Sequence, residues 1–494
     1  MGAGTIAAAA VLLIPLGTAG LLQVAPRRTI ANLVAVGGAV GLLAAVLVVM
    51  HRVLNGGAIT WGDGILRLDD LSALLLFVLG VVGFSAVVYS VDYLGREGSP
   101  RALPLRRLRR YHGFVILFLF SMLLVGSTNN LGVLWIALEG TTLVSAILVG
   151  YYHTPSAIEA SWKYLILCSV GLVLALLGTL FLDLASLRAG ASAGSALNWT
   201  TLIGEAPHLD PGLVRLACVF LFLGYGTKAG WVPLHTWLPD AHSEAPAPVS
   251  ALLSGALLNC AVYALLRLDG VTLRMPGFGF AGWLFLGFGL LSVTVAALFI
   301  LVQRDLKRLL AYSSVENMGI IAIGVGVGGA LGLLGALFQM LNHAMTKATL
   351  FLVGGSLTLV TGTKEISEMQ GALTGAPTLG ALLLVGGLAL AGVPPFSLFA
   401  SEYLIVTASF GAGQYAVAGV LLGALAVAFA GLMVRFSRIV LGSPGYCSFA
   451  PRAWQALASG VAISVTLLLA LGLGLVLPGP LAALLQGAVH VVNG

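Results

Sequence analysis

Apolar stretches of about 20 residues, enough for one α-helix to cross a bilayer, recur along almost the whole chain. Charged residues or Pro and Gly turns interrupt them. Charged residues make up 9% of the 494 residues, whereas a soluble protein carries about 25%. The pattern excludes a soluble enzyme and predicts an all-α polytopic membrane protein.

The apolar stretches predict fourteen membrane-spanning helices, which begin near residues 5, 30, 70, 111, 130, 160, 212, 248, 281, 306, 331, 376, 412 and 456. The stretch from Met1 to Ala25 has no basic start and is long enough to span, so we expect a retained helix rather than a cleaved signal. An even number of helices places both termini on the same side of the membrane.

Lysines and arginines divide unequally between the two membrane faces when the loops alternate. Fifteen lie on the face that holds the basic segment from Tyr93 to Arg110. Six lie on the opposite face: Arg52, Arg67, Arg188, Arg215, Arg267 and Arg274. Because basic residues concentrate on the cytoplasmic side, the basic segment is predicted to be cytoplasmic and both termini outside. The formal charge of +6 is thus attributed to anchoring at lipid headgroups and not to nucleic-acid binding.

The three other basic residues, Lys163, Lys228 and Lys347, fall inside apolar stretches. A lysine at the bilayer centre costs roughly 2.5 to 3.5 kcal/mol, and such residues usually mark an ion pathway. Lys228 precedes Pro233, which is expected to break its helix. Lys163 lies near a membrane end, where extension of its ammonium to the surface is the alternative to a transport role.

Glu139 adds a carboxylate to the first half of the chain. The second half contains the same kinds of residue: a lysine and a carboxylate within apolar stretches, and a proline break. His343 and Lys347 are four residues apart and share a helix face. Pro394 and Pro395 interrupt another apolar stretch, with Glu402 just beyond. Because the two proline breaks are five predicted helices apart, the two units should run through the membrane in opposite senses, as inverted repeats do.

Titratable side chains at membrane depth suit proton transfer. Burial disfavours the charged form of an amine or carboxylate, and a nearby opposite charge restores it. Glu139 and Lys228 are therefore predicted to form a coupled gate. The alternative is a static buried ion pair that fixes helix register.

The segment after Pro233 contains a second set of polar residues, His235, Asp240, His242 and Glu244. Their spacings of seven and two match no compact metal site. A proton-entry vestibule or a docking surface for a partner subunit is favoured. The four cysteines (Cys168, Cys218, Cys260 and Cys447) form no CxxC or Cys/His cluster, so no iron–sulfur cluster or other cofactor is expected in this chain.

The segments KAGWVPLHTWLPDAHSEAPAPVSALLSG, ALE at Glu139, H-x-x-x-K at His343 and GVPPF resemble the antiporter-like membrane subunits of respiratory complex I, group 4 hydrogenases and multisubunit sodium/proton antiporters. LEGTTLVSAILVGYYHT, EASWKYLILCSVG and AYSSVENMGI are most similar to hydrogenase-4 component F. The resemblance implies an N-terminal three-helix segment with a basic loop (1–110), two inverted five-helix units (111–268 and 281–437) and a C-terminal helix (438–494). It implies proton stations at Glu139, Lys163, Lys228, His343, Lys347 and Glu402.

Three positions depart from the family pattern. Asn259 and Ser254 stand where relatives carry a lysine or a histidine. Neither titrates near neutral pH, so water held by Ser250, Ser254 and Asn259 is expected to replace a direct relay between the halves. Glu316 stands where some relatives have Ser-His, and it is either an additional station or a structural residue near the membrane surface.

The resemblance implies a proton-pumping subunit, in a bacterial or archaeal cytoplasmic membrane, that is driven by redox chemistry in partner subunits. The expected partners are other membrane subunits, lipid and a peripheral arm of iron–sulfur proteins, with a nickel–iron hydrogenase in the favoured version and an NADH-oxidising arm in the other. Catalysis would belong to the complex. The alternatives are a sodium/proton antiporter subunit, a membrane partner in bicarbonate uptake and a membrane anchor with inactive channels.

Overall fold

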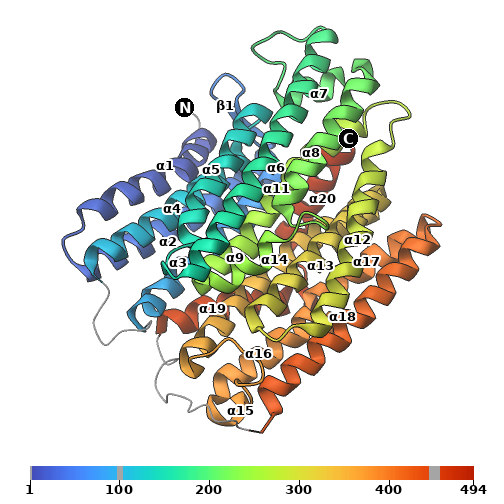
Figure 1. The fold of residues 1–494 in the computed structure, drawn as a ribbon. Coiled ribbons are helices and arrows are strands. Elements are labelled where there is room, and N and C mark those ends of the chain that lie inside the picture. Colours follow the sequence, from blue (N-terminus) through green and yellow to red (C-terminus); the bar gives the residue numbers. More distant parts are fainter. Residues whose placement is uncertain (1–2, 97–103, 444–456) are drawn as a thin grey trace.

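Helices make up most of the computed structural model, which describes residues 3–96, 104–443 and 457–494 (Figure 1). Within these ranges thirteen helical segments are long and apolar enough to cross a membrane. Cys447 and part of the predicted basic segment lie outside the described residues.

Twelve of these segments are single helices. They are α1 (Ala3–Val24), α2 (Arg28–Gly56), α3 (Asp70–Arg96), α4 (Leu105–Ser127), α5 (Leu131–Val149), α6 (Pro155–Arg188), α8 (Pro211–Ala229), α12 (Phe280–Val302), α13 (Leu306–Val327), α14 (Gly329–Thr361), α18 (Tyr415–Leu441) and α19 (Leu457–Leu475). The thirteenth is composite and consists of α10 (Ala247–Leu252), a π-helical turn η2 (Leu253–Leu257) and α11 (Leu258–Thr272).

Two further helices near the second predicted break are each too short to span alone. These are α16 (Pro377–Leu390) and α17 (Ser397–Gly411), with 14 and 15 residues, where about 20 are needed. The sequence predicts fourteen crossings, and thirteen segments long enough to span are found among the described residues. The remaining short helices are α7 (Trp199–Glu205), η1 (Ala206–His208), α9 (Trp237–Glu244), α15 (Ala372–Gly375) and α20 (Gly479–Asn493).

Both predicted helix breaks are present. The helix α8 ends at Gly230, whose φ of 76° requires a glycine-like backbone, and Pro233 lies between it and α9. Pro394 and Pro395 lie between α16 and α17. The backbone freed by the first break is held by neighbouring helices, because Val232 donates its N–H to the Ser292 hydroxyl at 3.0 Å. This fits the rule that irregular backbone at membrane depth must be satisfied by protein or water.

The helices divide into a buried centre and a perimeter. The α10–α11 span is 100% buried and α3 is 94% buried, whereas α18 is only 28% buried. Such outward-facing apolar helices are those expected to contact lipid. In Figure 1, α1 and α2 lie at one side of the bundle and α18 at the other, with α11 and α14 between them. The polar side chains considered below lie mainly between the central helices.

Two small elements lie at the end of the bundle that is predicted to face outside, and they were not predicted. The strands β1 (Ile59–Trp61) and β2 (Leu66–Leu68) form an antiparallel hairpin in which Thr60 faces Arg67. The helix α20 buries one face, which includes Leu484 and Ala488. Arg274 donates to the carbonyl of Val492 at 2.8 Å and so holds the end of α20.

Candidate functional site

Lys228 lies at the centre of the first polar cluster. Its side chain is fully buried, and its Nζ donates to Thr142 Oγ1 at 2.7 Å and to Tyr164 Oη at 2.8 Å. The Tyr164 hydroxyl lies 2.7 Å from the hydroxyl of Ser145. Two helices, α5 and α6, thus place hydroxyl groups around the ammonium that α8 carries. Among the described residues no carboxylate oxygen lies within 4.0 Å of it.

Glu139 lies on the same side of α5, three residues before Thr142. Its Oε1 accepts a hydrogen bond from Ser169 Oγ at 2.9 Å, and its Oε2 is buried without a hydrogen-bond partner among the described residues. Glu139 and Lys228 do not form a direct ion pair. The predicted coupling between them must act through the hydroxyl groups of α5 and α6 or through space.

Lys163 differs from the other two lysines. Its side chain is 50% exposed, and Nζ lies 2.7 Å from Glu159 and 3.4 Å from Asp240. Asp240 also pairs with Arg308 at 2.9 Å. Lys163 sits near the start of α6, where its long side chain reaches other charged groups, which favours the surface alternative for this lysine.

The second cluster surrounds Lys347 on α14. This lysine is also fully buried. Its Nζ donates to the carbonyl of Leu310 at 2.8 Å and to the hydroxyl of Ser313 on α13. His343, one turn before it, is buried as well, and neither ring nitrogen makes a hydrogen bond of standard geometry.

A chain of hydrogen bonds leads from this cluster to the second helix break, and it was missed by sequence reasoning. The Asn317 amide donates to the carbonyl of Ser313 at 2.8 Å. Gln339 then donates to Asn317 Oδ1 at 2.8 Å and accepts from the hydroxyl of Ser401. The available signal was a run of uncharged polar residues within apolar helices. Such residues do not titrate, so a pattern of ionisable side chains does not reveal them.

Glu402 follows Ser401 directly and faces the break before α17. The φ of Gly392, 66°, disfavours a residue with a side chain, and a Cβ atom there would press on Glu402 Oε2, so that the end of the Glu402 side chain would have to move. Glu402 and Gly392 line a cavity of about 310 Å³. Glu316 lies beside Asn317 on α13 and is 4% exposed, so it is one of the buried groups of the second cluster.

The composite span α10–η2–α11 lies between the two clusters. Within it the Ser254 hydroxyl lies 2.8 Å from that of Ser314 on α13. The Asn259 amide donates to the carbonyl of Met340 on α14 at 3.2 Å, and its Oδ1 has no hydrogen-bond partner among the described residues. Ser250 donates to the carbonyl of His242 at 3.1 Å. The π-helical turn at Leu253–Leu257 falls between these polar residues, and such turns are frequent at functional sites.

The residues of the segment after Pro233 do not gather at one point. The ring of His242 stacks on Phe351 at 4.8 Å, and that of His235 lies 6.1 Å from Tyr312. Glu244 pairs with Lys364 at 3.0 Å. In the part of the chain that the structure describes, no three His, Cys, Asp or Glu side chains are placed to hold a metal ion.

Glu244 lines an open cavity of about 720 Å³ at the predicted cytoplasmic end. Its other charged lining residues are Arg304, Asp305, Arg308, Lys364 and Glu365. Burial raises the pKa of Glu244, but the hydrogen bond and charge of Lys364 outweigh it and hold this pKa below its ordinary value. Lys307, assigned from sequence to surface anchoring, is 4% exposed instead and donates to the carbonyl of Ala245 at 2.8 Å.

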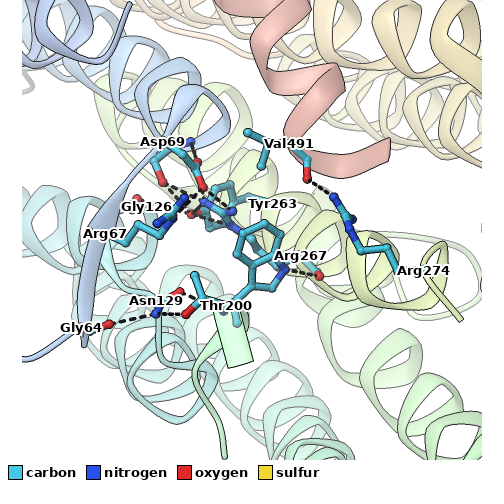
Figure 2. Close-up of polar contacts among 12 residues, drawn as sticks. Gly64, Arg67, Asp69, Gly126, Asn129, Thr200, Tyr263, Arg267, Arg274 and Val491 are labelled. Atoms are coloured by element: carbon cyan, nitrogen blue, oxygen red, sulfur yellow. Dashed lines mark hydrogen bonds and ion pairs between the residues drawn. The ribbon is translucent and has the colours of Figure 1, made fainter. Parts of the chain in front are cut away.

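A third polar cluster lies where α3 begins and α11 ends (Figure 2). Arg267 donates to both oxygens of Asp69, at 2.8 and 2.7 Å, and to the Tyr263 hydroxyl at 2.8 Å. The guanidinium also lies 4.4 Å from the ring centre of Trp199. The sequence assigns Arg267 to the membrane face opposite the basic segment. In the structure its side chain is 3% exposed and lies near the end of α11, which continues to Thr272.

These features define a class of protein. It is a polytopic helical membrane subunit with two interrupted helices, each near a buried lysine surrounded by uncharged polar groups.

Comparison with known proteins identifies the family. The model of the family described as NADH:quinone oxidoreductase/Mrp antiporter, transmembrane, matches residues 128–429. The chain belongs to this family.

Two relatives illustrate its range. The hydrogenase-4 component F homolog of Methylacidiphilum infernorum is 40% identical over 377 residues, which cover 76% of this chain and 79% of that protein. The NADH-quinone oxidoreductase subunit N of Desulforudis audaxviator is 32% identical over 377 residues, or 74% of this chain and 71% of the relative.

Solved structures have the same fold. A chain of an archaeal membrane-bound sulfane sulfur reductase matches with a TM-score of 0.85 at 23% identity, over 98% of this chain and 97% of its own length. A chain of the Mrp complex from Dietzia sp. matches with a TM-score of 0.84 at 21% identity over the full length of both.

Proposed function

We propose that this chain is a proton-translocating membrane subunit of a redox-driven complex in a bacterial or archaeal cytoplasmic membrane, with both termini outside. The observation that carries the proposal is the setting of Lys228 and Lys347. Both are fully buried, and both are hydrogen-bonded to hydroxyl or carbonyl oxygens and not to carboxylates. An amine in such a setting can change between its charged and neutral forms as nearby charges move.

We propose that protons move along the polar groups around these lysines. In the first unit, Ser169 donates a hydrogen bond to Glu139, and Lys228 donates to Thr142 and Tyr164 on the same two helices, α5 and α6. In the second unit, hydrogen bonds run from Lys347 to the residue before Glu402. Between the units we propose that water takes part, held by Ser250, Ser254 and Asn259. His343 and Glu316 would act as further stations beside it.

The favoured complex is of the hydrogenase-4 type, because the component F homolog is 40% identical and aligned over most of both chains. We propose that other membrane subunits surround this chain and that a peripheral arm with iron–sulfur proteins, including a nickel–iron hydrogenase, supplies the driving reaction. The chain itself would hold no cofactor and would contribute transport, while catalysis belongs to the complex.

A sodium/proton antiporter subunit is the second candidate. It is supported by the match to the Mrp complex chain over the full length of both. The same buried lysines and carboxylates would then serve exchange of the two ions without a redox partner.

The experiment is redox-driven transport by the purified complex in liposomes, followed with a pH-sensitive dye. The sodium concentration is varied while the osmolarity is kept constant. We expect the electron donor to start proton movement at the same rate with and without sodium. Proton movement that needs a sodium gradient and ignores the electron donor would overturn the proposal in favour of the antiporter.

A further inference from the structure

A pocket between α4 and α5 lies outside both polar clusters and has no part in the proposed transport. Its volume is about 680 Å³, within the range of ordinary ligand sites. Its polar wall is formed by Arg106, Arg107, Arg110 and His153, and its apolar wall includes Phe114 and Ile147.

The polar wall carries positive charge with no compensating group. None of the described lining residues is acidic, and none of the three arginines forms an ion pair with a described carboxylate. Arg107 is fixed in place, because its Nη2 donates to the carbonyl of Tyr151 at 3.0 Å and its Cζ lies 4.8 Å from the centre of that ring. Arg106 and Arg110 are exposed.

The helix itself adds to this charge. The arginines occupy the first two turns of α4, which has no acidic residue in its first turn and no side-chain cap. The start of a helix carries partial positive charge, so basic residues there are unfavourable unless an anion is near. In the part of the chain that the structure describes, this anion does not come from the protein.

The position of the pocket indicates where the anion comes from. The start of α4 is the cytoplasmic end by the distribution of basic residues. The apolar wall faces outward, since Ile147 is 51% exposed on a helix of the membrane domain. A ligand that fits has a phosphate at one end and a hydrocarbon chain at the other. Basic pockets between helices on this side of a membrane suit anionic lipid headgroups.

We propose that the pocket between α4 and α5 binds one anionic phospholipid of the cytoplasmic leaflet. Arg106, Arg107 and Arg110 hold its phosphate, and an acyl chain lies along Phe114 and Ile147. The inference does not depend on the ion that the chain transports. The site ties α4 and α5 to the leaflet surface next to the unit that contains Lys228.

The test uses the whole purified complex in phosphatidylglycerol bicelles, washed in neutral detergent, with retained lipid counted by mass spectrometry. The variant is Arg106→Gln/Arg110→Gln. The control is Arg27→Gln/Arg28→Gln, which removes the same charge at the start of α2 on the same face. We expect about 30-fold weaker retention of one phosphatidylglycerol in the variant, from the loss of two arginine contacts, and unchanged retention in the control.

Two further measurements keep the result clear. An Arg106→Lys/Arg110→Lys variant should restore most of the binding, which separates loss of charge from loss of fold. Excess inorganic phosphate should leave retention unchanged, because it lacks the acyl chain. Equal retention in the glutamine variant and the wild type, equal loss in the control, or displacement of the lipid by phosphate alone would each overturn the proposal.

Discussion

At the scale of single residues, the two buried lysines are held in different ways. Two hydroxyl groups bind Lys228, whereas a carbonyl and a hydroxyl bind Lys347. Both positions were found from sequence alone, since a charge inside a long apolar stretch is conspicuous. Their hydrogen-bond partners were not found, because a single serine, threonine or tyrosine in such a stretch does not differ from ordinary helix composition.

Gln339 is the residue whose replacement tests the hydrogen-bond chain of the second unit. We expect Gln339→Leu to lower proton transport at least severalfold, because it removes the donor to Asn317 and the acceptor for Ser401. The unsatisfied groups should also destabilise the fold by about 1–3 kcal/mol. The control is Gln303→Leu, on the exposed end of α12. Transport at the wild-type rate in the Gln339 variant would exclude this route.

The pair of Asp69 and Arg267 is expected to stabilise the fold. Removing one partner should then destabilise the protein more than removing both. Asp69→Asn keeps an acceptor for the backbone of Ser72 but leaves a buried guanidinium uncompensated. We expect a loss of about 3–5 kcal/mol, as for other broken buried pairs. The double variant Asp69→Asn/Arg267→Met should recover most of it. Thermal unfolding of the complex measures the stability of the single and the double variant. Additive losses in the double variant would argue against a coupled pair.

Acid stability gives a second test of this pair. Burial raises the pKa of Asp69, but the charge and hydrogen bonds of Arg267 outweigh it, so the pKa lies below the ordinary value of 3.8. For a lowered pKa, the stabilisation is complete above the ordinary value and is lost as the pH falls through the lowered one. On acidification below pH 3.8 the wild type should lose more thermal stability than the Asp69→Asn/Arg267→Met variant. The same loss in both would contradict the assignment.

At the scale of helices, the two proline breaks in the membrane helices were the most predictable feature. Proline within a spanning helix removes a backbone donor, and both predicted breaks are present at Pro233 and at Pro394–Pro395. The π-helical turn in the α10–α11 span and the β1–β2 hairpin were not predicted. A π-helical turn leaves no local composition signal, and strands of three residues are too short for an alternating pattern to be visible.

The second break gives a prediction at this scale. We expect Gly392→Ala to displace Glu402, because the added Cβ would lie 2.4 Å from its carboxylate and the φ of 66° disfavours any other residue. Proton transport should fall severalfold while the complex still assembles. Gly411→Ala is the control, since no atom lies within 4 Å of the added Cβ. Equal transport in the two variants would show that the placement of Glu402 is unimportant.

At the scale of the whole molecule, the order of the helices follows from the spacing of the apolar stretches, and the fold is that of the family. The division into a three-helix segment, two inverted units and a C-terminal helix stays a prediction. The buried outer cluster around Arg267 was out of reach of sequence reasoning, because it joins residues almost 200 positions apart along the chain. Only the packing of α3 against α11 brings them together.

The most direct measurement of the central claim is the number of protons moved per electron by the intact complex in liposomes, compared between wild type and the Lys228→Met and Lys347→Met variants. Lys163→Met, whose side chain is half-exposed, is the comparison for removal of a lysine at the membrane edge. We predict that each buried-lysine variant keeps its assembly and its uncoupled electron-transfer rate but moves fewer protons per electron. An unchanged ratio in both variants would contradict the claim and favour a membrane anchor with inactive channels.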